Sequence, residues 1–324
     1  MRIGSILGLA ALAVLVGCNG GQRSSNGDSK GYKIAMIPKG TSHEFWKTVE
    51  AGARKAADEL NVDLTWKGTA TEDERNQQIQ IVNDFVGVVD AIALAPLDSK
   101  GLRGPVKSAN EAGTPVIIFD SSIEDSKIVS FVATDNRAAG AKAGEAMVEK
   151  LGGSGTVIVL RYQEGSASTN EREEGFLAAV RAGGLEVLSD EQYAGASSEE
   201  ARQNGGRLLQ RFISGNRLTI DGVFCPNESS AFGMLLAMQE AGVAGTVAFF
   251  GFDSNEKLLD GLRNGDVDGL ILQDPFNMGY ITVKTIVAHL NGESVEPLTD
   301  TGSTLVTSEN IDSDAIQKLL NPLG

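Results

Sequence analysis

Carboxylate, amide and aromatic side chains recur just after the short apolar runs of this chain. Asp120 follows the apolar run at 116–119, and Asn227 closely follows the run at 222–225. Carboxylates and amides bind adjacent hydroxyl groups through paired hydrogen bonds, and aromatic rings cover the C–H face of a sugar ring. The pattern therefore predicts a site for a polyol. The candidate ligand-binding residues are His43, Phe45, Trp46, Asp120, Ser121, Asn170, Arg172, Asn227, Asp253 and Gln273.

Each candidate also has a plain structural interpretation. Asn227 and Asp253 could cap the helices that follow them, because short polar side chains accept hydrogen bonds from the free N–H groups at helix starts. Trp46 could be a packing residue, although Glu50 on the next turn argues against a deep position in the core. His43 could be a polar residue at a helix start. The candidates therefore indicate a site through their joint occurrence.

Other chemistries lack their signatures in this sequence. It has no Gly-rich phosphate loop with Lys-Ser/Thr and no dinucleotide fingerprint after the first apolar run. Two histidines and one internal cysteine, Cys225, form no transition-metal cluster at ligand spacing. Asp120 and Asp253 could form a carboxylate pair for glycoside cleavage, but most other candidates would then have no catalytic duty. We expect a binding protein without enzymatic activity, cofactor or metal.

Apolar runs alternate with amphipathic helical stretches from Tyr32 onward, which predicts a doubly wound α/β architecture with parallel sheets. Ligands of such sheets bind beyond the carboxyl ends of the strands, where the candidates lie. Capping boxes are predicted to begin helices at Thr71, Ser168 and Ser197. The predicted strands are residues 33–37, 62–66, 91–95, 116–119, 130–133, 156–160, 185–188, 222–225, 247–251 and 269–272.

Length and charge limit the possible classes of protein. A chain of 324 residues is longer than one hydrophobic core usually serves, so two lobes are expected. The net charge of −15 repels phosphate backbones, which argues against nucleic acid as a partner. We expect a monomer. Cys225 lies in an apolar run, which favours a buried, inert thiol.

The first residues have the layout of a secretory signal peptide, with Arg2 before a short apolar run that ends at Gly17. Leu15 to Cys18 resembles a bacterial lipobox, which implies cleavage after residue 17 and a lipid on Cys18. An ordinary signal peptide with an incidental cysteine is the alternative. Residues 18–31 would form a flexible Gly/Ser/Asn-rich tether. The body would then lie in the periplasm, attached to a membrane only through the lipid.

Four groups of residues stand out together: the stretch 39–46, the stretch 115–120, the helix start at 170–176, and Asn227 and Asp253 with their preceding runs together with Gln273. Through these groups the chain resembles the periplasmic sugar-binding proteins of the ribose-binding type, from about Tyr32 to the C-terminus. The resemblance implies two α/β lobes joined by a three-crossover hinge, with the ligand in the cleft between them. The N-terminal lobe would comprise residues 32–133 plus 275–301, and the C-terminal lobe 134–273 plus 302–324.

The resemblance also implies delivery of a monosaccharide-like ligand to an ABC permease. Ribose itself is doubtful, because Ser121 and Asn170 stand where the ribose binders have arginines, and His43 replaces an asparagine. Another pentose, a hexose, a deoxy-sugar or a cyclised signalling sugar stays possible. Two other functions stay open: a receptor subunit that presents its ligand to a sensor kinase, and a sugar-sensing regulator of the lactose-repressor type. The regulator would open with a basic helix-turn-helix domain, where this chain has an apolar leader.

Overall fold

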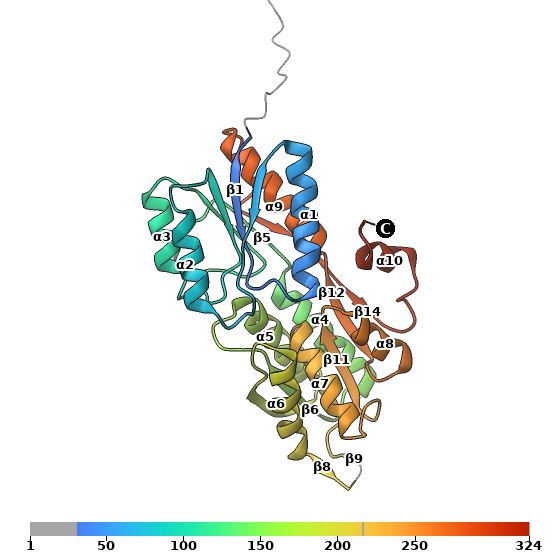
Figure 1. The fold of residues 1–324 in the computed structure, drawn as a ribbon. Coiled ribbons are helices and arrows are strands. Elements are labelled where there is room, and N and C mark those ends of the chain that lie inside the picture. The colour runs from blue at the N-terminus through green and yellow to red at the C-terminus, as the bar shows by residue number, and fades with distance from the viewer. Residues whose placement is uncertain (1–30, 216, 324) are drawn as a thin grey trace, which may run out of the picture.

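The computed structural model describes residues 31–215 and 217–323. They form two α/β lobes, each built on a six-stranded sheet with helices on both faces (Figure 1). The prediction of two doubly wound lobes is confirmed. The predicted signal peptide, Cys18 and the tether up to residue 30 lie outside the described residues. None of the helices in the described part is long and apolar enough to cross a membrane.

The N-terminal lobe has an all-parallel sheet in the order β13-β5-β4-β3-β1-β2. Two helices pack side by side on one face, α1 (Glu44–Leu60) and α9 (Pro275–Leu290), and two cover the other, α2 (Arg75–Phe85) and α3 (Arg103–Glu111) (Figure 1). The strands are β1 (Lys33–Ile37), β2 (Asp63–Trp66), β3 (Ala91–Leu94), β4 (Val116–Phe119), β5 (Phe131–Ala133) and β13 (Leu298–Asp300).

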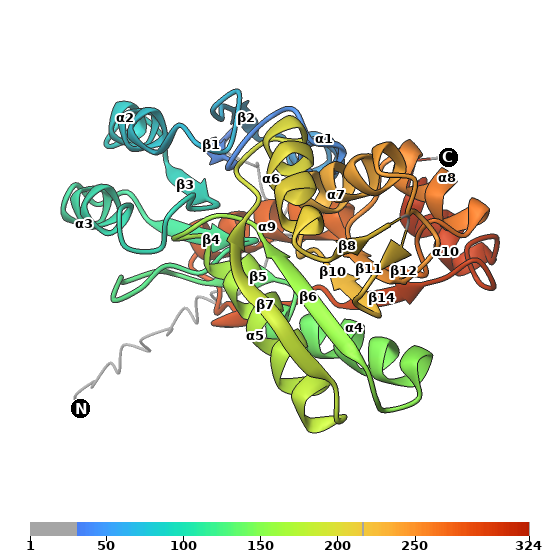
Figure 2. The same ribbon diagram turned by 90° about the horizontal axis from the view of Figure 1, so that it is seen from below.

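The C-terminal lobe repeats this plan, with the sheet order β14-β12-β11-β10-β6-β7 and an antiparallel edge strand, β14. Figure 2 shows β6 and β7 side by side in this sheet. Its strands are β6 (Thr156–Arg161), β7 (Glu186–Tyr193), β10 (Gly222–Phe224), β11 (Ala248–Phe252), β12 (Gly269–Gln273) and β14 (Ser303–Val306), and a small hairpin adds β8 (Ile213–Ser214) and β9 (Arg217–Leu218). Its helices are α4 (Asn136–Leu151), α5 (Ala167–Ala182), α6 (Ser198–Gln210), α7 (Glu228–Glu240), α8 (Glu256–Asn264) and α10 (Asp314–Leu320).

Three connections carry the described chain from one sheet to the other. They join β5 to α4, β12 to α9, and β13 to β14. These connections are residues 134–135, 274 and 301–302, and the lobe boundaries predicted from the sequence were 133/134, 273/275 and 301/302.

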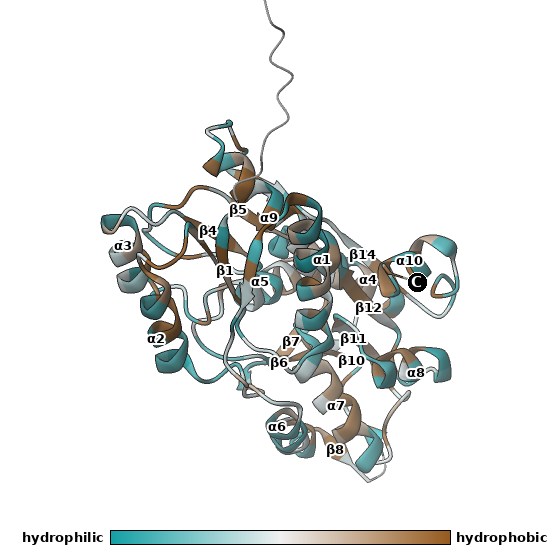
Figure 3. Cartoon of the chain, turned by 45° about the horizontal axis from the view of Figure 1, so that its top comes forward, coloured by the Kyte–Doolittle hydropathy of each residue, from teal (hydrophilic) through white to brown (hydrophobic). Residues whose placement is uncertain are grey.

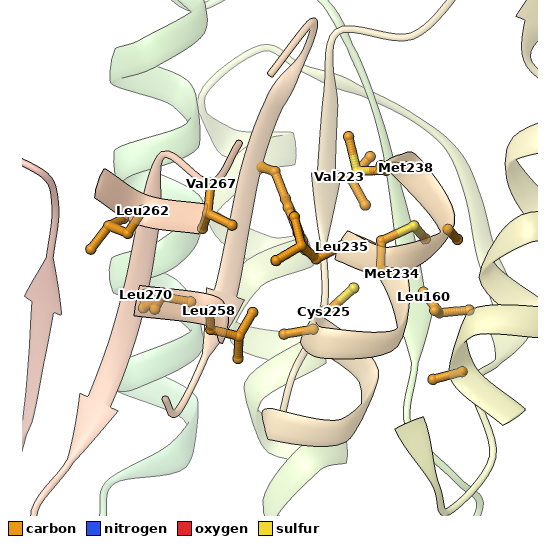
Figure 4. Close-up of a cluster of buried hydrophobic side chains, with 14 of the residues drawn as sticks. Leu160, Val223, Cys225, Met234, Leu235, Met238, Leu258, Leu262, Val267 and Leu270 are labelled. Atoms are coloured by element: carbon orange, nitrogen blue, oxygen red, sulfur yellow. The ribbon is translucent and has the colours of Figure 1, made fainter. Parts of the chain in front are cut away.

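The sheets form from continuous apolar runs because their strands are covered by helices on both faces. Every residue of β3 and β4 is fully buried, and Figure 3 shows the hydrophobic colour concentrated on such strands. Figure 4 shows one of the C-terminal lobe's clusters, which contains Val223 of β10, Leu235 of α7 and Leu258 of α8. Cys225 is fully buried in this cluster, and burial raises the pKa of its thiol well above the usual value. The prediction that the Cys225 thiol is buried is confirmed.

Two of the three predicted capping boxes are wrong. Ser197 does cap α6, with its hydroxyl accepting from Glu200 N and the Glu200 carboxylate accepting in return. The helix α2 begins only at Arg75, and α5 begins at Ala167 with Ser166 as its N-cap residue. Thr71 and Ser168 therefore do not begin helices, and the Ser168 hydroxyl instead accepts a hydrogen bond from Lys39.

Candidate functional site

A small cavity lies where the carboxyl ends of the two sheets face each other. Both lobes contribute to its wall. Eight of the ten predicted ligand-binding residues line it: His43, Phe45, Trp46, Asp120, Arg172, Asn227, Asp253 and Gln273. Six further lining residues were absent from the predicted set: Lys39, Glu72, Tyr162, Ser168, Thr169 and Glu228.

The other two predicted residues, Ser121 and Asn170, do not line the cavity. Ser121 is fully buried, and its hydroxyl accepts a hydrogen bond of 3.0 Å from the backbone N–H of Ser168 in the other lobe. The Asn170 amide oxygen accepts a bond of 3.4 Å from Arg161. Both side chains are thus engaged by protein groups, and Ser121 joins the lobes beside the cavity.

A buried ion pair forms one wall of the cavity. Lys39 lies two residues after β1, and its ammonium nitrogen is 3.1 Å from the Asp120 Oδ2 atom. The same ammonium donates to the hydroxyl of Ser168, at 2.9 Å, and to that of Ser166, at 3.3 Å. A buried cation needs such partners, because removing it from water is costly. Lys39 could have been found from the sequence by the same signal as Asp120, because it is a polar residue that follows an apolar run.

A second ion pair joins His43, the N-cap residue of α1, to Glu72, with 3.0 Å between Nδ1 and Oε1. The Glu72 carboxylate also accepts from Trp46 Nε1, at 2.7 Å, and from the Tyr162 hydroxyl, at 2.9 Å. Burial alone would lower the pKa of His43, but the Glu72 carboxylate outweighs it and raises that pKa to about 9. Burial works against ionisation of Glu72 too, yet His43 holds the Glu72 pKa at about 2. Both groups are therefore charged at neutral pH.

The two aromatic residues of α1 lie edge to face, with ring centroids 4.8 Å apart. Trp46 is only 3% exposed and also contacts Phe119, so the sequence argument against a deep position was wrong. The hydrogen bond from its indole N–H to Glu72 explains why it is tolerated there. Trp46 therefore packs in the core and lines the cavity with Phe45.

Arg172 of α5 is held by several partners in the second lobe. Its Nη1 atom donates to the Pro226 carbonyl at 3.0 Å and lies 3.7 Å from Asp253 Oδ2. Its Nε atom donates to the Asn136 side chain at 2.8 Å, and its guanidinium carbon is 3.9 Å from the Phe252 ring centroid. These contacts fix one orientation of the guanidinium group at the cavity wall.

Two glycines allow the close approach of α4 and α5 that places Arg172. A Cβ atom on Gly140 of α4 would collide with the backbone oxygen of Arg172, and one on Gly175 of α5 would collide with that of Arg137. The helix backbones therefore touch at two points. Any larger residue there would push α5, and Arg172 with it, away from α4.

Asp120 and Asp253 occupy matching positions in the two lobes, each just after a central strand. Both have a left-handed backbone, with φ of 61° for Asp120 and 63° for Asp253. Such a conformation is costly for a residue with a side chain and gathers at functional sites. Asp253 does not cap α8, because Asn255 does so. Asn227 does cap α7, so the capping interpretation is correct for that residue, which also lines the cavity.

One buried acceptor atom of the cavity wall, Gln273 Oε1, has neither a hydrogen bond nor an ion pair within the described residues, whereas Asp120 Oδ2 has its ion pair with Lys39. The Gln273 amide donates to Asp253 Oδ1 at 2.7 Å, which leaves the Gln273 oxygen free. Buried acceptors are normally satisfied, so this oxygen indicates a donor that comes from outside the chain. The described residues contain no cluster of three histidine, cysteine or acidic groups fit to hold a metal ion.

Residues 34–294 match the model of a family described as periplasmic binding protein domain. The chain belongs to this family. The resemblance seen in the sequence is thereby confirmed, and membership implies a place outside the cytoplasm.

Individual relatives agree with this assignment. The ribose import binding protein of Escherichia coli K12 is 28% identical over 298 residues, which cover 91% of this chain and 94% of that protein. A carbohydrate transporter solute-binding protein of Agrobacterium radiobacter, solved with D-arabinose, is 34% identical, with a TM-score of 0.84 over 90% of this chain and 99% of that chain. An ABC transporter solute-binding protein of Agrobacterium vitis with bound D-fucose is 34% identical, with a TM-score of 0.83 over 88% and 98%.

Proposed function

We propose that this protein captures a monosaccharide-like ligand outside the cytoplasm and delivers it to an ABC importer. The observation that carries the proposal is the cavity between the lobes, with Asp120 and Asp253 in its wall and the buried Gln273 Oε1 atom without a donor. Sugar hydroxyls are donors of the required kind. The cavity's aromatic residues, Phe45 and Trp46, offer apolar surface for a ring.

Relatives favour transport over the rival functions. Several carry import or ABC transport in their names, and the two Agrobacterium proteins were solved with a sugar bound. Presentation of a signalling sugar to a sensor kinase would use the same cavity and is the second candidate. The proposal includes a permease as partner, a monomeric state, no enzymatic activity, and attachment to a membrane by a lipid on Cys18.

The proposal is tested by a thermal-shift screen across pentoses, hexoses and deoxy-sugars, followed by calorimetry on each hit. A ligand at 100 times its dissociation constant adds about 2.7 kcal/mol to the free energy of unfolding, which is readily detected. Asp120→Asn and Asp253→Asn should each weaken binding by about tenfold to over a hundredfold, because hydrogen bonds to charged groups contribute roughly 1.5–3 kcal/mol.

Glu50→Gln serves as the matched control, since Glu50 lies on α1 outside the cavity and pairs with Arg54. The control should bind like the wild-type protein. Near-wild-type affinity in both aspartate variants would mean that the ligand binds elsewhere, and a protein that binds no sugar in the screen would refute the proposed function.

A further inference from the structure

The positive and negative charges of the side chains that line the cavity are unequal in number. Three cations line it, and each faces one carboxylate. The pairs are Lys39 with Asp120, at 3.1 Å, His43 with Glu72, at 3.0 Å, and Arg172 with Asp253, at 3.7 Å. Glu228 is the fourth carboxylate of the wall, and within the described part of the chain it makes no ion pair.

Glu228 is also poorly satisfied by hydrogen bonds. It stands at the first position of α7 and is 8% exposed. Its two oxygens accept only long bonds, 3.5 Å from the backbone N–H of Phe45 and 3.4 Å from the amide of Asn255. A charged carboxylate with such weak donors is costly when buried, which favours either its protonated form or a cationic partner.

Two groups of the wall are incompletely satisfied within the described residues. Gln273 Oε1 lacks a hydrogen-bond donor and Glu228 lacks a cation, whereas Asp120 Oδ2 has its ion pair with Lys39. The Lys39 ammonium is bound to two serine hydroxyls and Asp120, and Nε and Nη1 of Arg172 are bound to an amide oxygen and a carbonyl. A ligand that donates to Gln273 and carries a positive charge toward Glu228 would satisfy both groups.

We propose that the preferred ligand is a cationic amino sugar or amino-polyol whose ammonium group binds Glu228, while its hydroxyls donate to Asp120 and Gln273. This inference rests on the proposed function, since it names the ligand class of the same cavity. An ammonium donates up to three hydrogen bonds and supplies the positive charge that Glu228 lacks. A neutral sugar would leave Glu228 without a cation.

Electrostatics around Glu228 agree with this assignment. Burial raises the pKa of Glu228 to about 7, with Asp253 acting in the same direction, while His43, Asn255 and the Phe45 N–H act against it. An ammonium beside the carboxylate would favour its charged form and lower this pKa. Binding of a cationic ligand at pH 6 should therefore release a proton from Glu228.

The test uses calorimetry on matched probes with the full-length protein. The probes are D-glucosamine, D-galactosamine, D-mannosamine and 1-deoxynojirimycin, each against its neutral parent sugar, and the three N-acetylated amino sugars, which keep the size but lose the charge. At least one amine should bind about tenfold more tightly than both its neutral counterparts, as expected for a charge-assisted hydrogen bond. Titrations at pH 6 in two buffers of different ionisation enthalpy should show proton release with that amine.

Glu228→Gln is the decisive variant because it keeps the shape of the side chain and removes its charge. It should reduce the preference for the amine over the neutral sugar by about tenfold and abolish the proton release, whereas Glu50→Gln should change neither. If neutral sugars bind as tightly as every amine, or if the preference survives in Glu228→Gln, the ligand class is wrong while the proposed function stands. If no probe or sugar of the screen binds, the proposed function itself fails.

Discussion

Replacing Glu72 with glutamine should shift the titration of His43 by more than one pH unit. Glu72 is the carboxylate that keeps His43 protonated, with 3.0 Å between Nδ1 and Oε1. Glutamine has the same shape and can still accept from Trp46 Nε1, so the packing around the indole should persist. Burial would then dominate and lower the pKa of His43 toward or below its ordinary value.

The size of the effect follows from the raised pKa. A rise from 6.5 to about 9 corresponds to roughly 3 kcal/mol of differential interaction, at about 1.4 kcal/mol per unit. Because the folded-state pKa is raised, this stabilisation is fully present below pH 6.5 and is lost as the pH rises through about 9. The wild-type protein should therefore lose more unfolding free energy than Glu72→Gln between pH 6 and pH 10.

Nuclear magnetic resonance of the imidazole carbons gives a direct readout, because the chain has only two histidines. His289, near the end of α9, supplies an internal reference outside the cavity. Urea unfolding at pH 6 and pH 10 measures the matching change in stability. A wild-type His43 that titrates near 6.5, or one whose midpoint is unchanged in Glu72→Gln, would refute the ion pair and the reasoning built on it.

Three other changes test the remaining features. Gly140→Val should destabilise the protein by about 1–3 kcal/mol and weaken sugar binding, because its side chain would collide with the backbone of Arg172; unchanged melting and affinity would contradict the close helix contact. Saturating ligand should reduce the radius of gyration in small-angle scattering, since both lobes supply the cavity wall, and an unchanged radius would indicate a rigid binder. Cys18→Ser should release the protein from membranes or leave it unprocessed without weakening binding, and wild-type protein found wholly in the soluble periplasmic fraction would refute the lipid anchor.

The central strands could be predicted because burial on both faces makes them continuous apolar runs. The observed bounds of β1 and β4 are those predicted, 33–37 and 116–119. Edge strands lack this signal. The strands β13 and β14 alternate exposed or half-exposed residues and were missed, and β7 continues through polar residues to Tyr193 beyond the predicted end at 188.

Site residues that follow a strand were likewise predictable, because the carboxyl ends of parallel strands meet at one edge. Glu72 carries no such signal. It lies in the connection before α2, and its partners Trp46 and Tyr162 are 26 and 90 residues away in the chain, so only the folded arrangement reveals its place. The prediction that Ser121 belongs to the site failed for the opposite reason. Ser121 follows a strand, but its hydroxyl accepts a hydrogen bond from the backbone N–H of Ser168.

The polar contacts between the lobes indicate what decides closure. Lys39 donates to Ser168 and Tyr162 donates to Glu72, both at 2.9 Å and both from one lobe to the other. On opening, water would replace each partner, so each bond contributes roughly 1.5–3 kcal/mol net to the closed form, the range for hydrogen bonds to charged groups. The buried acceptor Gln273 Oε1 has no such partner in the closed form without a ligand. Closing without a ligand therefore leaves this acceptor unsatisfied, whereas a ligand that donates to it removes this cost, and we expect ligand binding and closure to be coupled for that reason.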